Sequence, residues 1–174
     1  MRLVFIMWVV YTIQMLVGDL GFLGIEPRTL SGLKGILFAP LIHGSTNHII
    51  SNSIPILMLG YTLYLFYNRI APRVFLIGYF FTNILVWIVG RPSYHIGASG
   101  LVYALAGFLI SYGFFKRNFK SLLISIVIIS FYGGIIYGIF PTRGFISWES
   151  HLAGFLVGIG MAYGFAKANA EDKS

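Results

Sequence analysis

Long apolar runs, separated by short clusters of charged and turn-forming residues, divide the whole chain into segments. An apolar stretch of about 20 residues can cross the hydrocarbon core of a bilayer as a helix. The pattern predicts six such spans, and a continuation of the first one as far as Ile25 stays open. Their approximate bounds are residues 3–17, 47–67, 74–89, 97–115, 121–140 and 150–166.

The composition agrees with a membrane protein. Of the 174 residues, 57% are hydrophobic and only 10% are charged, whereas soluble domains carry about 25% charged residues. The spans use most of this length, which excludes a water-soluble enzyme, a nucleic-acid-binding module and a sizeable additional soluble domain. We expect one all-α polytopic membrane domain over residues 1–174, a bundle of six transmembrane helices with a short polar tail from about residue 167.

The basic residues lie mostly between the predicted spans, where they act as orientation signals and contact lipid headgroups. The formal net charge of +7 therefore does not indicate a nucleic-acid partner. The first apolar run is interpreted as a retained span, because no small-residue cleavage site follows it. With the N-terminus inside, eight cations face the cytoplasm and four face outward, which predicts two cytoplasmic termini. The inner set is Arg2, Arg69, Arg73, Lys116, Arg117, Lys120, Lys167 and Lys173, and the outer set is Arg28, Lys34, Arg91 and Arg143.

Strongly polar residues gather at the start of every even-numbered span. An ionisable or polar group inside a span is costly, so such residues are functional candidates. In the predicted topology, all of these positions lie at one depth near the outer face. The three sets are His43, His48 and Asn52 at the second span, His95 and Ser99 at the fourth, and Glu149 and His151 at the sixth.

Ser99 lies between glycines in the sequence Gly97-Ala98-Ser99-Gly100. Glycine neighbours leave a hydroxyl accessible and allow close backbone approach. A serine hydroxyl becomes an effective nucleophile when a base takes its proton. Small residues at small spacing also pack membrane helices together, so this motif alone leaves both a catalytic and a packing interpretation open.

His151 is the candidate base at the start of the sixth span. Gly154 and Gly158 follow it, and this stripe of small residues would let the fourth span approach closely. Ser99 and His151 would then come within hydrogen-bond reach, and Tyr103, one turn below Ser99, would buttress the imidazole ring. An interfacial histidine that bonds only to a backbone carbonyl is the alternative.

Acidic residues are missing from the interior of every predicted span. Glu149 precedes His151 by two residues and would point away from it on a helix, which favours a Ser–His dyad over a triad. The four histidines have no accompanying acidic ligand and no His-x-x-x-His pair, and the chain has no cysteine, so a metal site is disfavoured. His43 and His95 taken alone are interpreted as interfacial hydrogen-bonding residues.

His48 and Asn52 are four residues apart and therefore share one face of a helix. An imidazole N–H and an amide N–H aimed at one point would stabilise an oxyanion, as acyl transfer requires. His48 and Asn52 are therefore the candidate residues for stabilising an oxyanion.

In this order and at this shared depth, the motifs resemble those of the rhomboid intramembrane serine proteases. The resemblance covers approximately residues 38–165 and implies a six-helix rhomboid-like bundle. Each motif alone is weak, but their combination in a six-span chain is specific. The matching residues are His48-x-x-x-Asn52, then Gly97-Ala98-Ser99-Gly100 followed by Leu101-Val102-Tyr103-Ala104, then His151-x-x-Gly154-x-x-x-Gly158.

The resemblance implies a role for each of these polar residues. Ser99 would be the nucleophile and His151 the general base. His48, Asn52 and the backbone N–H of Ser99 would line the oxyanion hole. The supporting positions would be Tyr103, which packs against the catalytic histidine, together with His43, Gly97, Gly100, Gly154 and Gly158.

The resemblance also implies partners and a location. Family members cleave transmembrane segments of other proteins near the outer membrane boundary and use no metal or organic cofactor. The expected partners are therefore transmembrane protein substrates and membrane lipids, not nucleic acid. We expect an integral, multi-pass protein of a prokaryotic plasma membrane. A catalytically silent rhomboid-like protein that binds transmembrane clients and a small transporter or channel are the alternatives.

The stretch between the first two spans departs from the family pattern. Many members have a long, membrane-embedded loop here that carries a Trp-Arg pair, whereas residues 18–39 form a short stretch without tryptophan. Glu26-Pro27-Arg28 would be a reduced version of this feature, and Ala39 stands where some relatives have another histidine. We expect a short polar stretch here and the basic six-helix form of the family.

Overall fold

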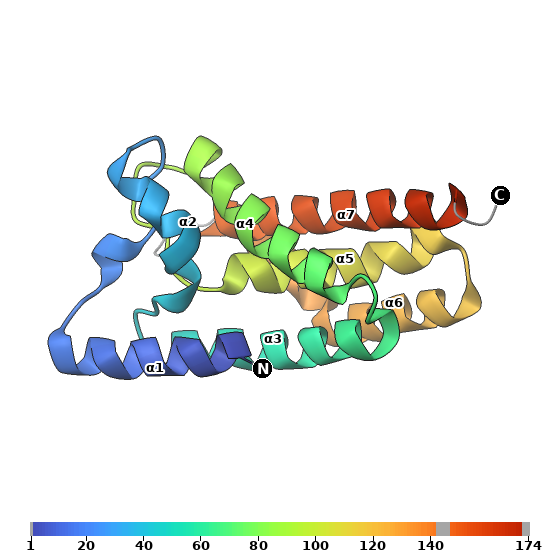
Figure 1. The fold of residues 1–174 in the computed structure, drawn as a ribbon, viewed down its shortest axis with the longest axis horizontal. Helices are drawn as coiled ribbons and strands as arrows, with labels where there is room; N and C mark the ends of the chain where they lie inside the picture. The colour runs from blue at the N-terminus through green and yellow to red at the C-terminus, as the bar shows by residue number, and fades with distance from the viewer. Residues whose placement is uncertain (1, 142–146, 172–174) are drawn as a thin grey trace.

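In the part of the chain that the structure describes, six long helices form the bundle shown in Figure 1. The computed structural model describes residues 2–141 and 147–171. The architecture confirms the predicted all-α bundle. The long helices are α1 (Arg2–Val17), α3 (Thr46–Tyr67), α4 (Ala71–Val89), α5 (Ser99–Lys116), α6 (Phe119–Tyr132), which continues as the 3-10 helix η4 (Gly133–Ile139), and α7 (Trp148–Glu171).

The long helices can be compared with the thickness of a bilayer. Among the described residues, four segments are long and apolar enough to cross a membrane: α3, α4, α5, and α6 together with η4. Helix α1 is apolar but has 16 residues, and α7 has 24 residues with several glycines that lower its hydropathy. Large apolar side chains such as Phe5, Leu16 and Phe131 are exposed on the outside of the bundle. A lipid-facing surface explains this exposure, since soluble monomers rarely expose such patches.

Helix α5 lies at the centre of the bundle and packs against α3, α4, α6 and α7. Of its 18 residues, 67% are buried, and a helix that is buried on all sides belongs to the core. Its partner α7 approaches it most closely. A Cβ atom on Gly154 would overlap the backbone carbonyl of Gly100, and one on Gly158 would overlap that of Ala104. The predicted glycine stripe therefore permits backbone-to-backbone contact between α5 and α7.

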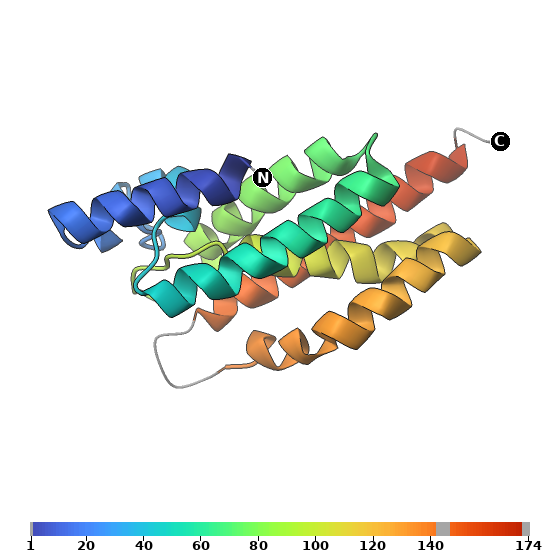
Figure 2. The same ribbon diagram turned by 90° about the horizontal axis from the view of Figure 1, so that it is seen from below.

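Helices α3, α5 and α7 all begin at the same end of the bundle, which we call the site end (Figures 1 and 2). At the opposite, distal end, α3 and α5 finish while α4 and α6 begin. The predicted shared depth of the three polar sets follows from this arrangement.

The boundaries differ from the predicted ones at several helices. Helix α7 continues to Glu171, five residues past the predicted end, so the predicted polar tail from about residue 167 is helical as far as Glu171. The first span does not continue to Ile25, because α1 ends at Val17 and Gly18 takes a positive φ of 100°. Ile25 instead forms an antiparallel bridge with His95, in which each backbone N–H donates to the other residue's carbonyl. Helix α4 begins at Ala71, three residues earlier than predicted, because proline is tolerated in the first turn of a helix. Arg143 and Lys173 lie outside the described residues.

The segment between α1 and α3 is more ordered than a short polar stretch, which corrects that prediction. Backbone carbonyls of this segment accept hydrogen bonds from side chains of α4. Trp87 donates from Nε1 to the carbonyl of Thr29 at 2.9 Å, and Asn83 donates from Nδ2 to the carbonyl of Ile36 at 3.0 Å. The segment contains η1 (Gly21–Leu23), η2 (Ser31–Lys34), α2 (Gly35–Phe38) and η3 (Ala39–Leu41).

Candidate active site

Ser99 and His151 are in contact at the site end. Ser99 is the first residue of α5, and His151 lies in the first turn of α7. The Nε2 atom of His151 is 2.9 Å from the Oγ atom of Ser99, although the two residues are 52 positions apart. The close packing of α5 on α7 produces this contact, because Gly154 lies one turn after His151 and touches Gly100.

The other ring nitrogen of His151 determines its tautomer. Its Nδ1 atom lies 3.0 Å from the carbonyl oxygen of Gly138. A carbonyl oxygen can only accept, so Nδ1 carries the proton and Nε2 presents a lone pair to the Ser99 hydroxyl. This is the tautomer that a general base next to a serine needs.

Tyr103 holds the imidazole ring of His151 in place. The two rings stack with centroids 4.2 Å apart and planes inclined by 6°. The Tyr103 hydroxyl donates to the carbonyl of Ile135 at 2.8 Å, which anchors the phenol ring on η4. The position expected for Tyr103 from its helical spacing to Ser99 is therefore the one that it takes.

Glu149 does not take part in this contact. Its Oε1 atom is 3.2 Å from Nε of Arg91, and its side chain is buried. Within residues 2–141 and 147–171, no carboxylate bonds to the imidazole ring of His151. The arrangement is a serine–histidine pair, with a backbone carbonyl where a triad has its acid.

His48 and Asn52 line the same cavity as Ser99 and His151. The cavity has a volume of about 720 Å³, within the usual range for ligand sites. Asn52 donates one amide N–H to the backbone carbonyl of His48 at 2.9 Å. Its amide has a second N–H, and the side chain is one of those that line the cavity.

The loop before α5 passes directly beside His48. Gly97 has a positive φ of 98°, and a Cβ atom there would lie 2.5 Å from Nε2 of His48. Only glycine fits this position, for both conformational and steric reasons. The first backbone N–H groups of α5, starting with that of Ser99, have no partner within the helix. These N–H groups place the positive end of the α5 helix dipole at the same cavity.

His43 supports His48 from behind. Its ring is fully buried and packs edge-on against the His48 ring, with centroids 4.9 Å apart. The Nδ1 atom donates to the carbonyl of Leu41 at 3.3 Å, and Nε2 has no partner among the described residues. Burial, and secondly the neighbouring His48, lower the pKa of His43 to about 4, so its ring is neutral at pH 7.

His95 ties the start of α7 to the loop before α5. Its Nε2 atom donates to the carbonyl of Arg91 at 3.0 Å, so its Nδ1 atom accepts from the Ser147 hydroxyl at 2.6 Å. The Ser147 carbonyl in turn accepts from the backbone N–H of His151. Burial lowers the pKa of His95 and keeps its ring neutral. Its interpretation as a hydrogen-bonding residue agrees with these contacts.

Two residues that contact the catalytic candidates were missed by sequence reasoning. The carbonyls of Ile135 and Gly138 bond to Tyr103 and His151, and both belong to η4. The pair Gly133-Gly134 interrupts the apolar run just before them and was the available signal. The described residues contain no group of three or more His, Cys, Asp or Glu side chains that could share a metal ion.

Comparison with known proteins identifies relatives of this chain. Residues 30–168 match the family model of the Rhomboid domain. The chain is 35% identical over 150 residues to proteins of Mycobacterium tuberculosis and Mycobacterium bovis, and 33% identical over 149 residues to one of Mycobacterium leprae, all described as uncharacterised. These matches cover 80% of this chain and 62%, 62% and 59% of the relatives. The chain thus spans about three fifths of the length of the curated relatives it matches.

Proposed function

We propose that this chain, which belongs to the rhomboid family, is an intramembrane serine endopeptidase that hydrolyses peptide bonds in or near transmembrane segments of other membrane proteins. One observation carries the proposal: Nε2 of His151 lies 2.9 Å from Oγ of Ser99. The bond from its Nδ1 to the Gly138 carbonyl leaves Nε2 free to accept the proton. Because the relatives are described as uncharacterised, the activity rests on the family and on this geometry.

The pair performs both halves of the hydrolysis. As Ser99 Oγ attacks the scissile carbonyl carbon, His151 Nε2 takes its proton, and the carbonyl electron pair moves onto oxygen. The electron pair then returns from the oxygen to re-form the carbonyl bond, and the C–N bond breaks. His151 gives its proton to the departing amine. A water molecule then attacks the resulting ester, and His151 takes a proton from this water. His151 finally returns a proton to Ser99 and releases the new carboxyl end.

The developing oxyanion would be stabilised on the side of the cavity formed by α3 and the start of α5. Asn52 has a second amide N–H, and His48 lies beside Gly97. The backbone N–H of Ser99 adds a donor at the positive end of the helix dipole. Preorganised donors of this kind are usually the largest single contribution to acyl-transfer catalysis.

The site end faces the outside of the membrane in our proposal, and both termini lie in the cytoplasm of a prokaryotic cell. Its support is the distribution of charge, since the distal end carries most of the cations that the positive-inside rule places in the cytoplasm. Hydrolysis needs water, which a cavity open to one aqueous face can supply. A substrate helix must unwind to expose a carbonyl, so segments with helix-breaking residues near the boundary should be preferred.

A cleavage assay in liposomes tests this function. Purified protein is reconstituted with model transmembrane segments that carry a helix-breaking residue near one boundary. We expect the wild type to cleave them and Ser99→Ala to be inactive, with an unchanged unfolding temperature. Cleavage by Ser99→Ala would show that another group is the nucleophile. A folded wild type that binds these segments without cleaving any of them would support the client-binding alternative.

A further inference from the structure

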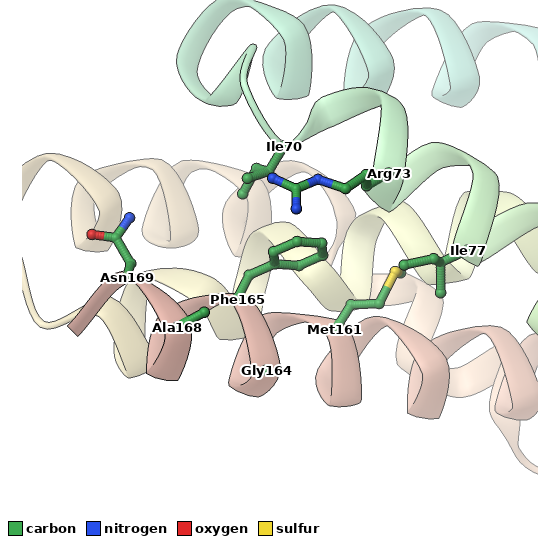
Figure 3. A pocket seen from close by; sticks show the side chains of 8 residues that line it. All are labelled: Ile70, Arg73, Ile77, Met161, Gly164, Phe165, Ala168 and Asn169. Carbon is green, nitrogen blue, oxygen red and sulfur yellow. The ribbon is translucent and has the colours of Figure 1, made fainter. Parts of the chain in front are cut away.

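A second hollow, which we call the distal groove, lies between α4 and α7 at the distal end (Figure 3). Its volume is about 410 Å³. The groove combines a long apolar lining with two polar side chains. The apolar residues are Ile70, Ile77, Met161 and Phe165, and the polar ones are Arg73 and Asn169.

Arg73 is placed to receive an anion. Its guanidinium carbon lies 5.3 Å above the ring centroid of Phe165, inside the view of the groove in Figure 3. Among the described residues, no carboxylate lies within 4 Å of it, and the side chain is exposed. A guanidinium offers five N–H donors in a planar fork that matches two oxygens of a phosphate. Asn169 also lines the groove, to the left of Phe165 in Figure 3.

The charge around the distal groove is strongly positive. Within the described part of the chain, the acidic residue at this end is Glu171, which lies 3.9 Å from Lys167. Clusters of basic residues where transmembrane helices meet the membrane surface attract anionic lipids. The other cations at this end are Arg69, Lys116, Arg117 and Lys120.

We propose that the distal groove binds one anionic phospholipid. The lipid phosphate accepts hydrogen bonds from Arg73, and one acyl chain follows the apolar wall formed by Ile77, Met161 and Phe165. A free inorganic anion would use Arg73 but would leave that wall bare. This proposal does not depend on the hydrolase function, because the groove lies at the opposite end of the bundle from Ser99.

Two glycines of α7 provide a matched pair for the test. Gly164 lines the groove and Gly160, one turn earlier, does not. A Cβ atom would meet nothing within 4 Å at either position. Gly164→Leu therefore adds a side chain to the wall of the groove with no clash at Cβ, and Gly160→Leu adds the same side chain outside it. Arg73→Gln and Lys167→Gln form the corresponding pair for charge, since Lys167 is exposed and does not line the groove.

Native mass spectrometry of the purified protein measures the binding. Phosphatidylglycerol and phosphatidylcholine with the same acyl chains are added separately to the wild type and to the four variants. We expect phosphatidylglycerol to bind more tightly than phosphatidylcholine, and Arg73→Gln to weaken phosphatidylglycerol binding about fivefold. Gly164→Leu should weaken the binding of both lipids, whereas Lys167→Gln and Gly160→Leu should leave it near the wild-type value.

Four results would overturn the proposal. Equal losses for Arg73→Gln and Lys167→Gln would show that general surface charge attracts the lipid. Equal effects of Gly164→Leu and Gly160→Leu on lipid adducts, or a change of oligomeric mass with Gly164→Leu alone, would show that no acyl chain occupies the groove. Displacement of phosphatidylglycerol by inorganic phosphate in the wild type would identify a free anion as the occupant.

Discussion

The α5–α7 pair and the α6–η4 segment differ sharply in how they pack. Whereas 67% of α5 is buried, only 17% of an 18-residue stretch of α6 and η4 is. Gly154 and Gly158 of α7 touch the α5 backbone, but a Cβ atom on Gly134 of η4 would meet nothing within 4 Å. Figure 2 shows α6 diverging from α5 toward the site end.

The difference in packing assigns two structural roles in the candidate site to two different parts of the bundle. The tightly packed pair holds Ser99 and His151 at a fixed distance. The loosely packed segment supplies the carbonyls of Ile135 and Gly138, which orient Tyr103 and His151. Segments with few buried contacts open more easily than the core. The distance between Ser99 and His151 is therefore built into the core, while the tautomer of His151 depends on a segment of lower local stability.

The largest expected effect of a substitution is on the rate of cleavage. His151→Ala should lower the cleavage rate by about 10⁴–10⁶-fold, because the base and the nucleophile act as one unit. Asn52→Ala should lower it by only about 10²–10³-fold, the usual cost of one oxyanion donor. Both are measured as kcat/KM on a reconstituted transmembrane substrate. Equal losses would contradict the separate roles given to the α5–α7 pair and to α3.

The next effect concerns stability at the α5–α7 contact. Gly154→Leu should destabilise the protein by more than about 4 kcal/mol, because its side chain would meet the α5 backbone, which cannot move aside. Gly160→Leu on the same helix is the control and should change stability little. Thermal unfolding in detergent distinguishes the two variants. Similar unfolding temperatures would mean that α5 and α7 are not in backbone contact.

We expect a pH dependence of stability from His43, which lies at the site end. His43 has a pKa of about 4 in the folded protein against 6.5 when unfolded, so the unfolded chain binds more protons between these values. The contribution of His43 to stability should be complete above pH 6.5 and fall by about 3 kcal/mol as the pH drops toward 4. His43→Leu should flatten this profile in equilibrium unfolding. Residues 119–139 contain no His, Asp or Glu and add no such dependence. An unchanged profile in the variant would show that His43 is not the group responsible.

A milder change tests the role of η4. A Cβ atom on Gly138 would lie 3.1 Å from Nδ1 of His151 and against the Tyr103 hydroxyl. Gly138→Ala should therefore displace the imidazole ring and lower kcat by up to about 10²-fold, as small misplacements of reacting groups do. Gly134→Ala, in the same 3-10 helix, should keep wild-type kcat. Equal rates for the two variants would show that η4 does not orient the imidazole ring.

Helical spacing and small residues predicted which catalytic candidates would meet if the fourth and sixth spans were neighbours. Ser99 and Tyr103 share a face of one helix, and the glycines after His151 indicate a close helix partner. Both inferences need only local periodicity and residue size. The contact between Ser99 and His151 follows once these two helices are neighbours.

The contributions of irregular segments could not be predicted in the same way. A 3-10 helix within a continuous apolar run has the hydropathy of a membrane span, so η4 was included in the predicted span 121–140. The segment after α1 is ordered by long-range bonds to Trp87 and Asn83, which no local pattern encodes. Its bridge between Ile25 and His95 likewise joins residues that are distant in the sequence.

The proposed chemistry depends above all on the activation of Ser99 by His151. Labelling with a fluorophosphonate tests this activation, because the reagent reacts with activated serines and requires no knowledge of the substrate. Purified wild type is compared with Ser99→Ala under the same conditions. We expect labelling of the wild type alone. Equal labelling of both proteins would place the reactive group elsewhere and contradict the role given to Ser99.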